Sequence, residues 1–138
     1  MKMSLLEKSE CFRAFLILIG IDGKISEEER RLLLMIGKKL DFESRFCETS
    51  INDLLENNYI DRNPPVFSRK EFAEEFIRDG IRLACSDDDL HPDEKEWLSR
   101  IAGQNGLSEE LLKKLCHEQG KPTGPRGELH NLAIEQYL

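Results

Sequence analysis

The chain has 138 residues and a net charge of −7 at pH 7, with 34% charged and 39% hydrophobic residues. That balance is typical of one globular domain, and the negative charge disfavours nucleic acid and anionic membrane surfaces as partners. The apolar run 14–21 is too short to cross a bilayer and follows acidic residues, so we expect neither direct membrane insertion nor a signal peptide. These features predict a cytoplasmic protein.

Helical periodicity dominates the first half of the chain. Apolar residues three and four positions apart predict helices over 5–20, 26–40 and 44–57. Ser26 and Glu29 have the spacing of a capping box, which marks the start of the second helix. The inward positions of these helices are expected to be Phe12, Phe15, Leu16, Ile19, Leu32, Leu33, Ile36, Leu40, Phe46, Ile51, Leu54 and Leu55.

A proline-containing break, DRNPPVF at 61–67, is expected to link two halves of the chain, because proline lacks the N–H that a helix needs. Three further helices are expected after it, with Ser68 as the first cap, Pro92 at the first helical position and Ser108 as the last cap. The tail 128–138 also has helical spacing and is expected to dock as a short helix. No segment alternates as a strand would, so the sequence predicts an all-α, single-domain bundle of six to seven helices.

The second half repeats the first at an offset of 65 residues. The repeat predicts two pseudo-symmetric halves, each of which needs the other to bury its apolar faces. Over the stretch 22–42 the identical pairs are Asp22 and Asp87, Glu29 and Glu94, Leu33 and Leu98, and Ile36 and Ile101. We expect Leu33, Ile36, Trp97, Leu98 and Ile101 to be buried where the halves meet.

The motifs IDGKISEEE at 21–29, SDDDLHPDE at 86–94 and IAGQNGLSEELL at 101–112 resemble the TerB-like family. That family comprises tellurite-resistance protein B and the N-terminal region of certain membrane-anchored DnaJ-like co-chaperones. The resemblance implies a bacterial, all-helical TerB-like domain, here over 1–120 with 121–138 as a C-terminal extension. It also implies a role in stress response and a divalent metal held by clustered acidic residues. The family's motif positions fall on Asp22, Glu29, Asp87 and Glu94.

The two acidic motifs are the candidate functional site. Helix capping accounts for Glu29 but leaves Asp22 without a structural role, and the adjacent carboxylates from Asp87 to Asp89 repel one another. A hard cation such as Ca²⁺ or Mg²⁺ would relieve that repulsion through oxygen ligands, although the spacing is not that of an EF-hand. A transition metal held by His91 with Asp87 or Asp89 is an alternative. The candidate metal ligands are Asp22, Glu29, Asp87, Asp89 and Glu94.

The sequence contains no GxSxG, P-loop, HExxH or glycine-rich phosphate-binding motif, so we expect a non-catalytic protein. Two functions remain open. In the first, the two acidic motifs bind a divalent metal ion. In the second, the protein is an acidic helical interaction module without metal, whose partner is a basic protein such as a membrane-associated stress protein. Metal binding requires the acids of both motifs to face a shared point, whereas a partner surface requires only net negative charge.

Overall fold

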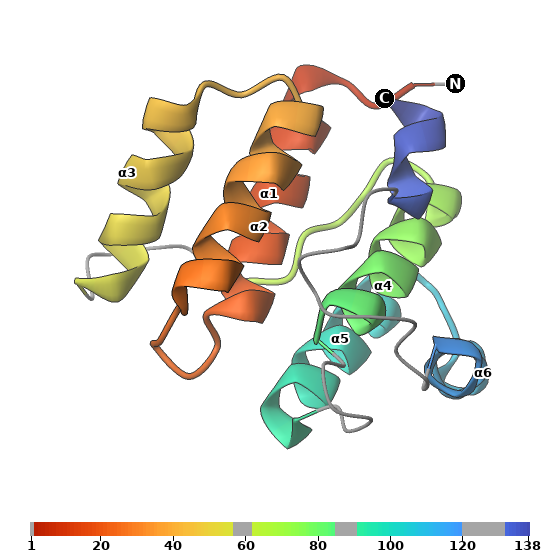
Figure 1. Ribbon diagram of the computed structural model, residues 1–138. Helices are drawn as coiled ribbons and strands as arrows, with labels where there is room; N and C mark the ends of the chain where they lie inside the picture. Colours follow the sequence, from red (N-terminus) through yellow and green to blue (C-terminus); the bar gives the residue numbers. More distant parts are fainter. Residues whose placement is uncertain (1, 57–61, 85–90, 120–131) are drawn as a thin grey trace.

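The computed structural model describes residues 2–56, 62–84, 91–119 and 132–138, and within them the protein is all-α with no strand. The predicted fold class is confirmed (Figure 1). The elements in chain order are α1 (Leu5–Ile19), α2 (Glu27–Lys39), α3 (Ser44–Leu55), α4 (Lys70–Ala84), α5 (Pro92–Gln104), α6 (Glu109–Gln119) and the 3₁₀ helix η2 (Ala133–Tyr137).

The sequence repeat is also present in the helix boundaries. Each helix of the second half begins 65 residues after its counterpart in the first half, and α1 and α2 also end 65 residues before α4 and α5. The ends of α2 and α5 are closed by the same backbone bonds: Phe42 N–H donates to the Gly37 carbonyl at 2.8 Å, and Leu107 N–H donates to the Ala102 carbonyl at 2.8 Å. The two halves are therefore local structural repeats.

The two halves meet mainly through α1 and α4. The Phe15 and Phe76 rings lie 4.6 Å apart at this contact, and Gly80 allows the Leu18 side chain to approach the α4 backbone. Helix α1 is buried around most of its circumference from Cys11 to Ile19, as expected for a central helix. The five residues predicted at the junction are all buried, but α2 packs on α1 and α3, and α5 packs on α4 and α6. The main contact between the halves is therefore that of α1 with α4, because the most apolar helix of each half takes the central position.

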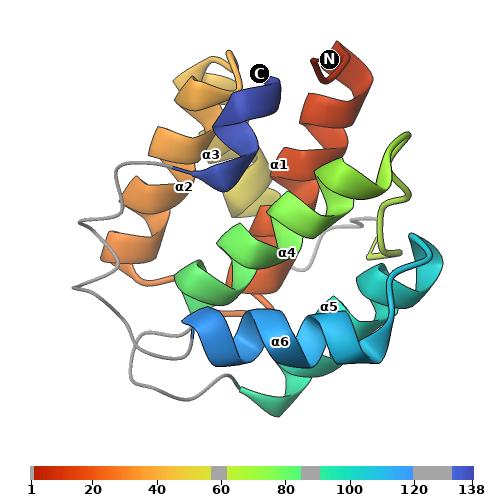
Figure 2. The ribbon, with the colours of Figure 1, turned by 90° about the vertical axis from the view of Figure 1, so that its right-hand side faces the viewer.

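The third helices of the two halves pack differently. Helix α3 lies mainly against α2, whereas α6 runs across both α4 and α5 (Figure 2). Gly37 of α2 permits the close approach of α3, since a Cβ at this position would collide with Sγ of Cys47. Phe46 of α3 is 47% exposed, contrary to its predicted inward position, and its ring lies against Phe42 at 5.3 Å.

Buried polar contacts hold the segment that links the halves. Asn105, at the end of α5, accepts a hydrogen bond from Phe67 N–H at 2.7 Å and donates one to the Pro65 carbonyl at 2.9 Å. The indole N–H of Trp97 donates to the Arg62 carbonyl at 3.2 Å. These bonds satisfy backbone groups that the proline-containing segment leaves outside any helix. The described part of the link is therefore packed into the fold.

Helix α4 begins at Lys70, one residue later than a cap at Ser68 would place it. The Ser68 hydroxyl and backbone N–H both donate to Oε2 of Glu7, at 2.8 and 3.0 Å, instead of serving the start of α4. Tertiary contact with α1 thus replaces the local cap that the sequence predicts.

The two described ends of the chain lie together at one end of the molecule (Figure 1). The Met3 N–H donates to the Tyr137 carbonyl at 2.6 Å. In the part of the chain that the structure describes, no helix combines the length and apolar character needed to cross a bilayer.

Candidate functional site

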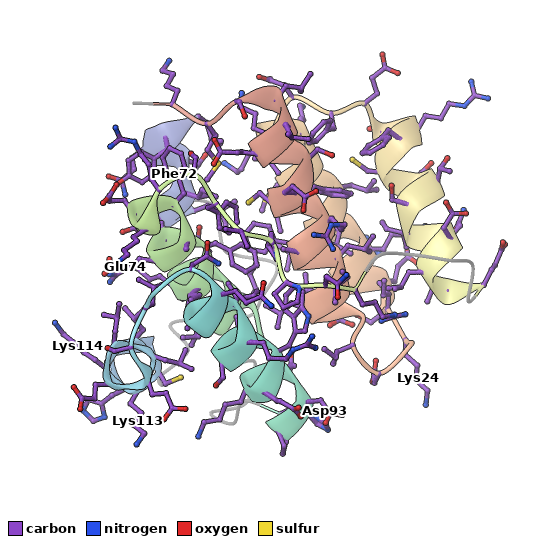
Figure 3. All side chains as sticks on the ribbon, turned by 180° about the vertical axis from the view of Figure 1, so that it is seen from behind. Lys24, Phe72, Glu74, Asp93, Lys113 and Lys114 are labelled. Atoms are coloured by element: carbon purple, nitrogen blue, oxygen red, sulfur yellow. The ribbon has the colours of Figure 1, made fainter. Side chains whose placement is uncertain are left out.

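A cleft of about 360 Å³ opens between the α1–α2 turn and the start of α5. Its lining comes from both halves of the repeat, and we call it the inter-turn cleft. The residues that line it are Ile19, Ile21, Asp22, Lys24, Ile25, Ser26, Glu29, His91 and Glu94. Lys24 on the α1–α2 turn and Asp93 at the start of α5 mark this end of the molecule in Figure 3.

Asp22 stabilises the first turn through its own side chain. Its Oδ1 accepts a hydrogen bond from Lys24 N–H at 3.0 Å, which closes an Asx turn. Between them Gly23 adopts φ +81°, a left-handed conformation that glycine takes without a steric penalty. Asp22 is exposed, and its Oδ2 makes no hydrogen bond or ion pair with any described residue. One oxygen of this carboxylate thus orders the turn while the other faces solvent.

The start of α2 is the capping box that the sequence predicts. The Ser26 hydroxyl accepts from Glu29 N–H at 3.1 Å, and Glu29 Oε1 accepts from Ser26 N–H at 3.0 Å. Two backbone donors at the helix start are satisfied reciprocally. Glu29 therefore has a structural role whether or not the cleft holds a ligand.

The start of α5 uses a histidine in the place of that serine. His91 Nδ1 accepts from Asp93 N–H at 3.2 Å, and Glu94 Oε1 accepts from His91 N–H at 3.3 Å. Glu94 lines the inter-turn cleft and is only 8% exposed, whereas the His91 side chain is 58% exposed. The equivalent residues Glu29 and Glu94 thus have equivalent capping roles.

The hydrogen bond to His91 decides which ring nitrogen carries the proton. A neutral imidazole that accepts through Nδ1 has its hydrogen on Nε2, so neither nitrogen offers a lone pair to a metal in this geometry. A metal ligand role for His91 would require the ring to give up its cap of α5. The alternative of a transition-metal site that includes His91 is accordingly disfavoured.

Three predicted site residues, Asp22, Glu29 and Glu94, line the same cleft although they come from different halves. Asp87 and Asp89 lie outside the described residues. Within the ranges that the structure describes, no group of three or more His, Cys, Asp or Glu side chains is arranged closely enough to hold a metal ion. The structure therefore brings Asp22 and Glu29 of the first motif and Glu94 of the second to one cleft, without a complete ligand set among the described side chains.

The sequence reasoning did not identify Lys24 as part of the site. Its position two residues after Asp22 was visible in the sequence, but only the turn geometry puts both residues on the cleft. The ammonium group reduces the net negative charge of the lining. Three carboxylates still face one lysine, so the inter-turn cleft remains acidic.

No protein-family model matches the chain, and comparisons with curated proteins and with solved structures give no match. The likeness to the TerB-like family thus rests on the three sequence motifs alone.

Proposed function

We propose that the protein is a non-catalytic helical domain that binds a hard divalent cation, Ca²⁺ or Mg²⁺, in the inter-turn cleft. The observation that carries this proposal is that Asp22, Glu29 and Glu94 line one cleft although the repeat separates them in sequence. A shared point is what metal binding requires of the two acidic motifs. A surface that attracts a basic partner by charge alone has no such requirement.

The chemistry of the lining favours a hard cation. Among the described residues, both halves contribute carboxylate side chains to the cleft, and carboxylate oxygens can coordinate a metal ion. Ca²⁺ and Mg²⁺ prefer such oxygen ligands. His91 uses Nδ1 to cap α5, so a site with imidazole coordination would weaken the start of that helix. We propose Asp22, Glu29 and Glu94 as ligands, together with Asp87 and Asp89 from the second motif.

Asp22 is the most informative of these residues. Its Oδ1 accepts the hydrogen bond that closes the Asx turn. Its Oδ2 accepts no hydrogen bond from a described residue, so this oxygen can coordinate a cation. Glu29 and Glu94 serve the capping boxes, so their removal would lower stability with or without a cation. Asp22 therefore separates a ligand role from a capping role.

The experiment is a thermal melt of the full chain with and without millimolar Ca²⁺, Mg²⁺, Mn²⁺ or Zn²⁺. A cation that binds only the folded state at a hundredfold excess over its Kd stabilises it by about 2.7 kcal/mol. We expect Ca²⁺ or Mg²⁺ to raise the Tm of the wild type. Asp22→Asn should keep the metal-free Tm, because an asparagine amide oxygen also accepts the Lys24 N–H, but it should lose most of the cation-induced shift.

The matched control is Glu48→Gln, which removes the same charge from an exposed position on α3 and should keep the full shift. His91→Ser supplies a different capping side chain and should also keep it. The proposal fails if no cation shifts the wild-type Tm, or if Asp22→Asn responds as the wild type does. A shift that is specific to zinc and lost in His91→Ser would instead indicate a transition-metal site.

The second candidate is an acidic interaction module without metal. Two observations favour it. The carboxylates of Asp22, Glu29 and Glu94 each accept a hydrogen bond from a nearby backbone N–H, which gives each a structural role without a metal. In addition, the described side chains include no cluster of three metal ligands. A basic protein partner, membrane-associated or not, would then contact the acidic motifs. The same melts distinguish the two candidates, because this module would show no cation-specific shift.

The cellular role that we propose is stress response of the tellurite-resistance type, in the bacterial cytoplasm. Its support is the resemblance of 21–29, 86–94 and 101–112 to the TerB-like motifs, together with the all-helical fold. The net charge of −7 supports a protein partner in preference to a nucleic acid.

A further inference from the structure

A buried aspartate anchors the C-terminal segment to the centre of the domain. Asp79 of α4 is 0% exposed, and its two carboxylate oxygens accept consecutive backbone N–H groups of η2, from Ala133 at 2.6 Å and from Ile134 at 3.0 Å. The equivalent position of the first half is Ala14, which is also buried but has no polar group in its side chain. The anchor is therefore a departure from the repeat.

We call residues 132–138 the C-terminal strap, because they tie together elements from both halves. Apart from Asp79, the strap is held by the Tyr137 ring against Phe72, with 4.8 Å between centroids, and by the Met3 N–H bond to the Tyr137 carbonyl. The Lys39 ammonium of α2 pairs with Glu135 at 2.8 Å. Ile134 is 0% exposed, so release of the strap would uncover apolar surface on the domain.

The charge of Asp79 is balanced incompletely. Arg82 approaches to 3.7 Å from the same helix and is itself partly exposed, while Glu75 adds a like charge from one turn earlier. From α1 the neighbouring titratable group is Cys11, a fully buried thiol whose pKa burial raises well above its usual value, so it stays neutral around pH 7. The strap itself contributes the two N–H donors to the carboxylate.

Desolvation outweighs these favourable contacts. Burial raises the pKa of Asp79 from 3.8 to about 6, although the N–H groups of Ala133 and Ile134 and the nearby Arg82 all act to lower it. Opening the strap removes the two N–H bonds that lower the pKa. An opening that admits water to the carboxylate also removes the larger desolvation, and the pKa then moves down toward the solvated value. The closed state thus binds the proton more tightly than the open state.

We propose that the C-terminal strap is a proton-linked latch, which closes most firmly when Asp79 is protonated and opens more readily when Asp79 is ionised. The sign follows from linkage: a carboxyl group with a raised pKa in the closed state stabilises that state below about pH 4, and the stabilisation is lost as the pH rises through about 6. The latch lies at the opposite end of the molecule from the α1–α2 turn (Figure 1), so it does not depend on cation binding in the inter-turn cleft.

The second carboxylate of the strap titrates in a different range. Burial raises the pKa of Glu135, but hydrogen bonds from the Lys39 ammonium and the Leu132 N–H outweigh this and hold it below its usual value. Glu135 therefore remains ionised between pH 5 and 7.5. A change in strap opening over that interval reports on Asp79.

The test is amide hydrogen exchange of the full chain by NMR between pH 5 and 7.5, corrected for the intrinsic dependence of exchange on pH. The opening constant measured at Ala133, Ile134 and Met3 should rise with pH, by up to about tenfold if Asp79 is fully solvated in the open state. The amide of Ile51 in α3 should show no such rise, because α3 and the strap lie on opposite sides of the molecule (Figure 1).

Two variants separate the latch from a purely structural contact. Asp79→Asn should make the opening constant of the strap independent of pH. This holds whether or not the substitution also weakens the closed strap, because asparagine does not titrate in this range. Glu135→Gln should raise strap opening by the same factor at every pH and keep the wild-type slope. The proposal is overturned if wild-type opening is flat or falls as the pH rises, or if Asp79→Asn keeps the wild-type slope.

Discussion

The first half of the molecule, α1 to α3, and the second half, α4 to α6, have almost the same helix boundaries but place their third helices differently. Helix α3 packs on the α2 side of the domain, and α6 lies across α4 and α5. Capping, periodicity and helix ends are local properties that both halves share. The packing of the third helix is a tertiary property. Gly37 admits α3 close to α2, and its equivalent in the second half is Ala102, so the difference shows where the repeat stops determining the structure.

Four pairs of equivalent positions carry different residues at points where the two halves can be compared directly. They concern the close contact beneath the third helix, the left-handed residue after the second helix, the cap of the second helix and the buried anchor of the strap. The pairs are Gly37 and Ala102, Asp41 and Gly106, Ser26 and His91, and Ala14 and Asp79. Substitutions at such pairs test whether equivalent positions contribute equally to the free energy of unfolding, as their shared helix boundaries suggest.

The largest effects are expected at a core pair that is identical in the two halves of the repeat. Ile36 and Ile101 are each 0% exposed, and truncation of either to alanine should lower the free energy of unfolding by about 2–5 kcal/mol. Denaturant melts of Ile36→Ala and Ile101→Ala measure both losses in the same background. A loss within error of zero for either variant would show that this half does not rely on its part of the core.

An intermediate effect is expected beneath α3. Gly37→Ala should cost about 1–3 kcal/mol, because the new methyl group collides with Sγ of Cys47 and α3 must shift. The reciprocal change Ala102→Gly should cost about 1 kcal/mol through helix propensity, and the loss of the buried Ala102 methyl group adds to that cost. If close packing is the reason, Gly37→Ala and Cys47→Ala will be non-additive, with the double variant losing less than the sum of the single variants in denaturant melts. Additive losses would rule out this contact as the cause.

The smallest effect is expected at the second residue after the second helix of each half. Asp41 and Gly106 both adopt left-handed φ values, 67° and 73°. Asp41→Gly should raise the free energy of unfolding by about 0.5–1 kcal/mol, since glycine has no steric penalty there and the exposed Lys8 pair that it removes contributes little.

The matched control at this pair is Gly106→Ala, which should destabilise the protein by about 1–2 kcal/mol because alanine disfavours that conformation. Urea melts provide both values. Equal stability of Asp41→Gly and wild type, with Gly106→Ala also tolerated, would mean that the two helix ends are not strained by this backbone angle.

The candidate site was predictable to the extent that it is local. Glu29 and Glu94 could be assigned to helix starts because a capping box is defined by residues three apart, and the structure has both boxes. The Asx turn of Asp22 was not predicted, because that side chain has several local partners available. His91 is by residue type only a mediocre cap, yet it holds the position that Ser26 has in the first half. The cleft that joins them depends on how α1 and α4 cross, which no spacing within one motif encodes.

The sequence by itself determined the helical class, the helix boundaries and the repeat, because periodicity and capping act over one or two turns of chain. Only the tertiary structure decided that α1 and α4 form the centre, that Ser68 binds Glu7 instead of capping α4, and that Asp79 is buried beneath the strap. These outcomes depend on which apolar faces meet and on the desolvation of polar groups between them. Both are properties of contacts between segments distant in sequence, where the local pattern carries no information.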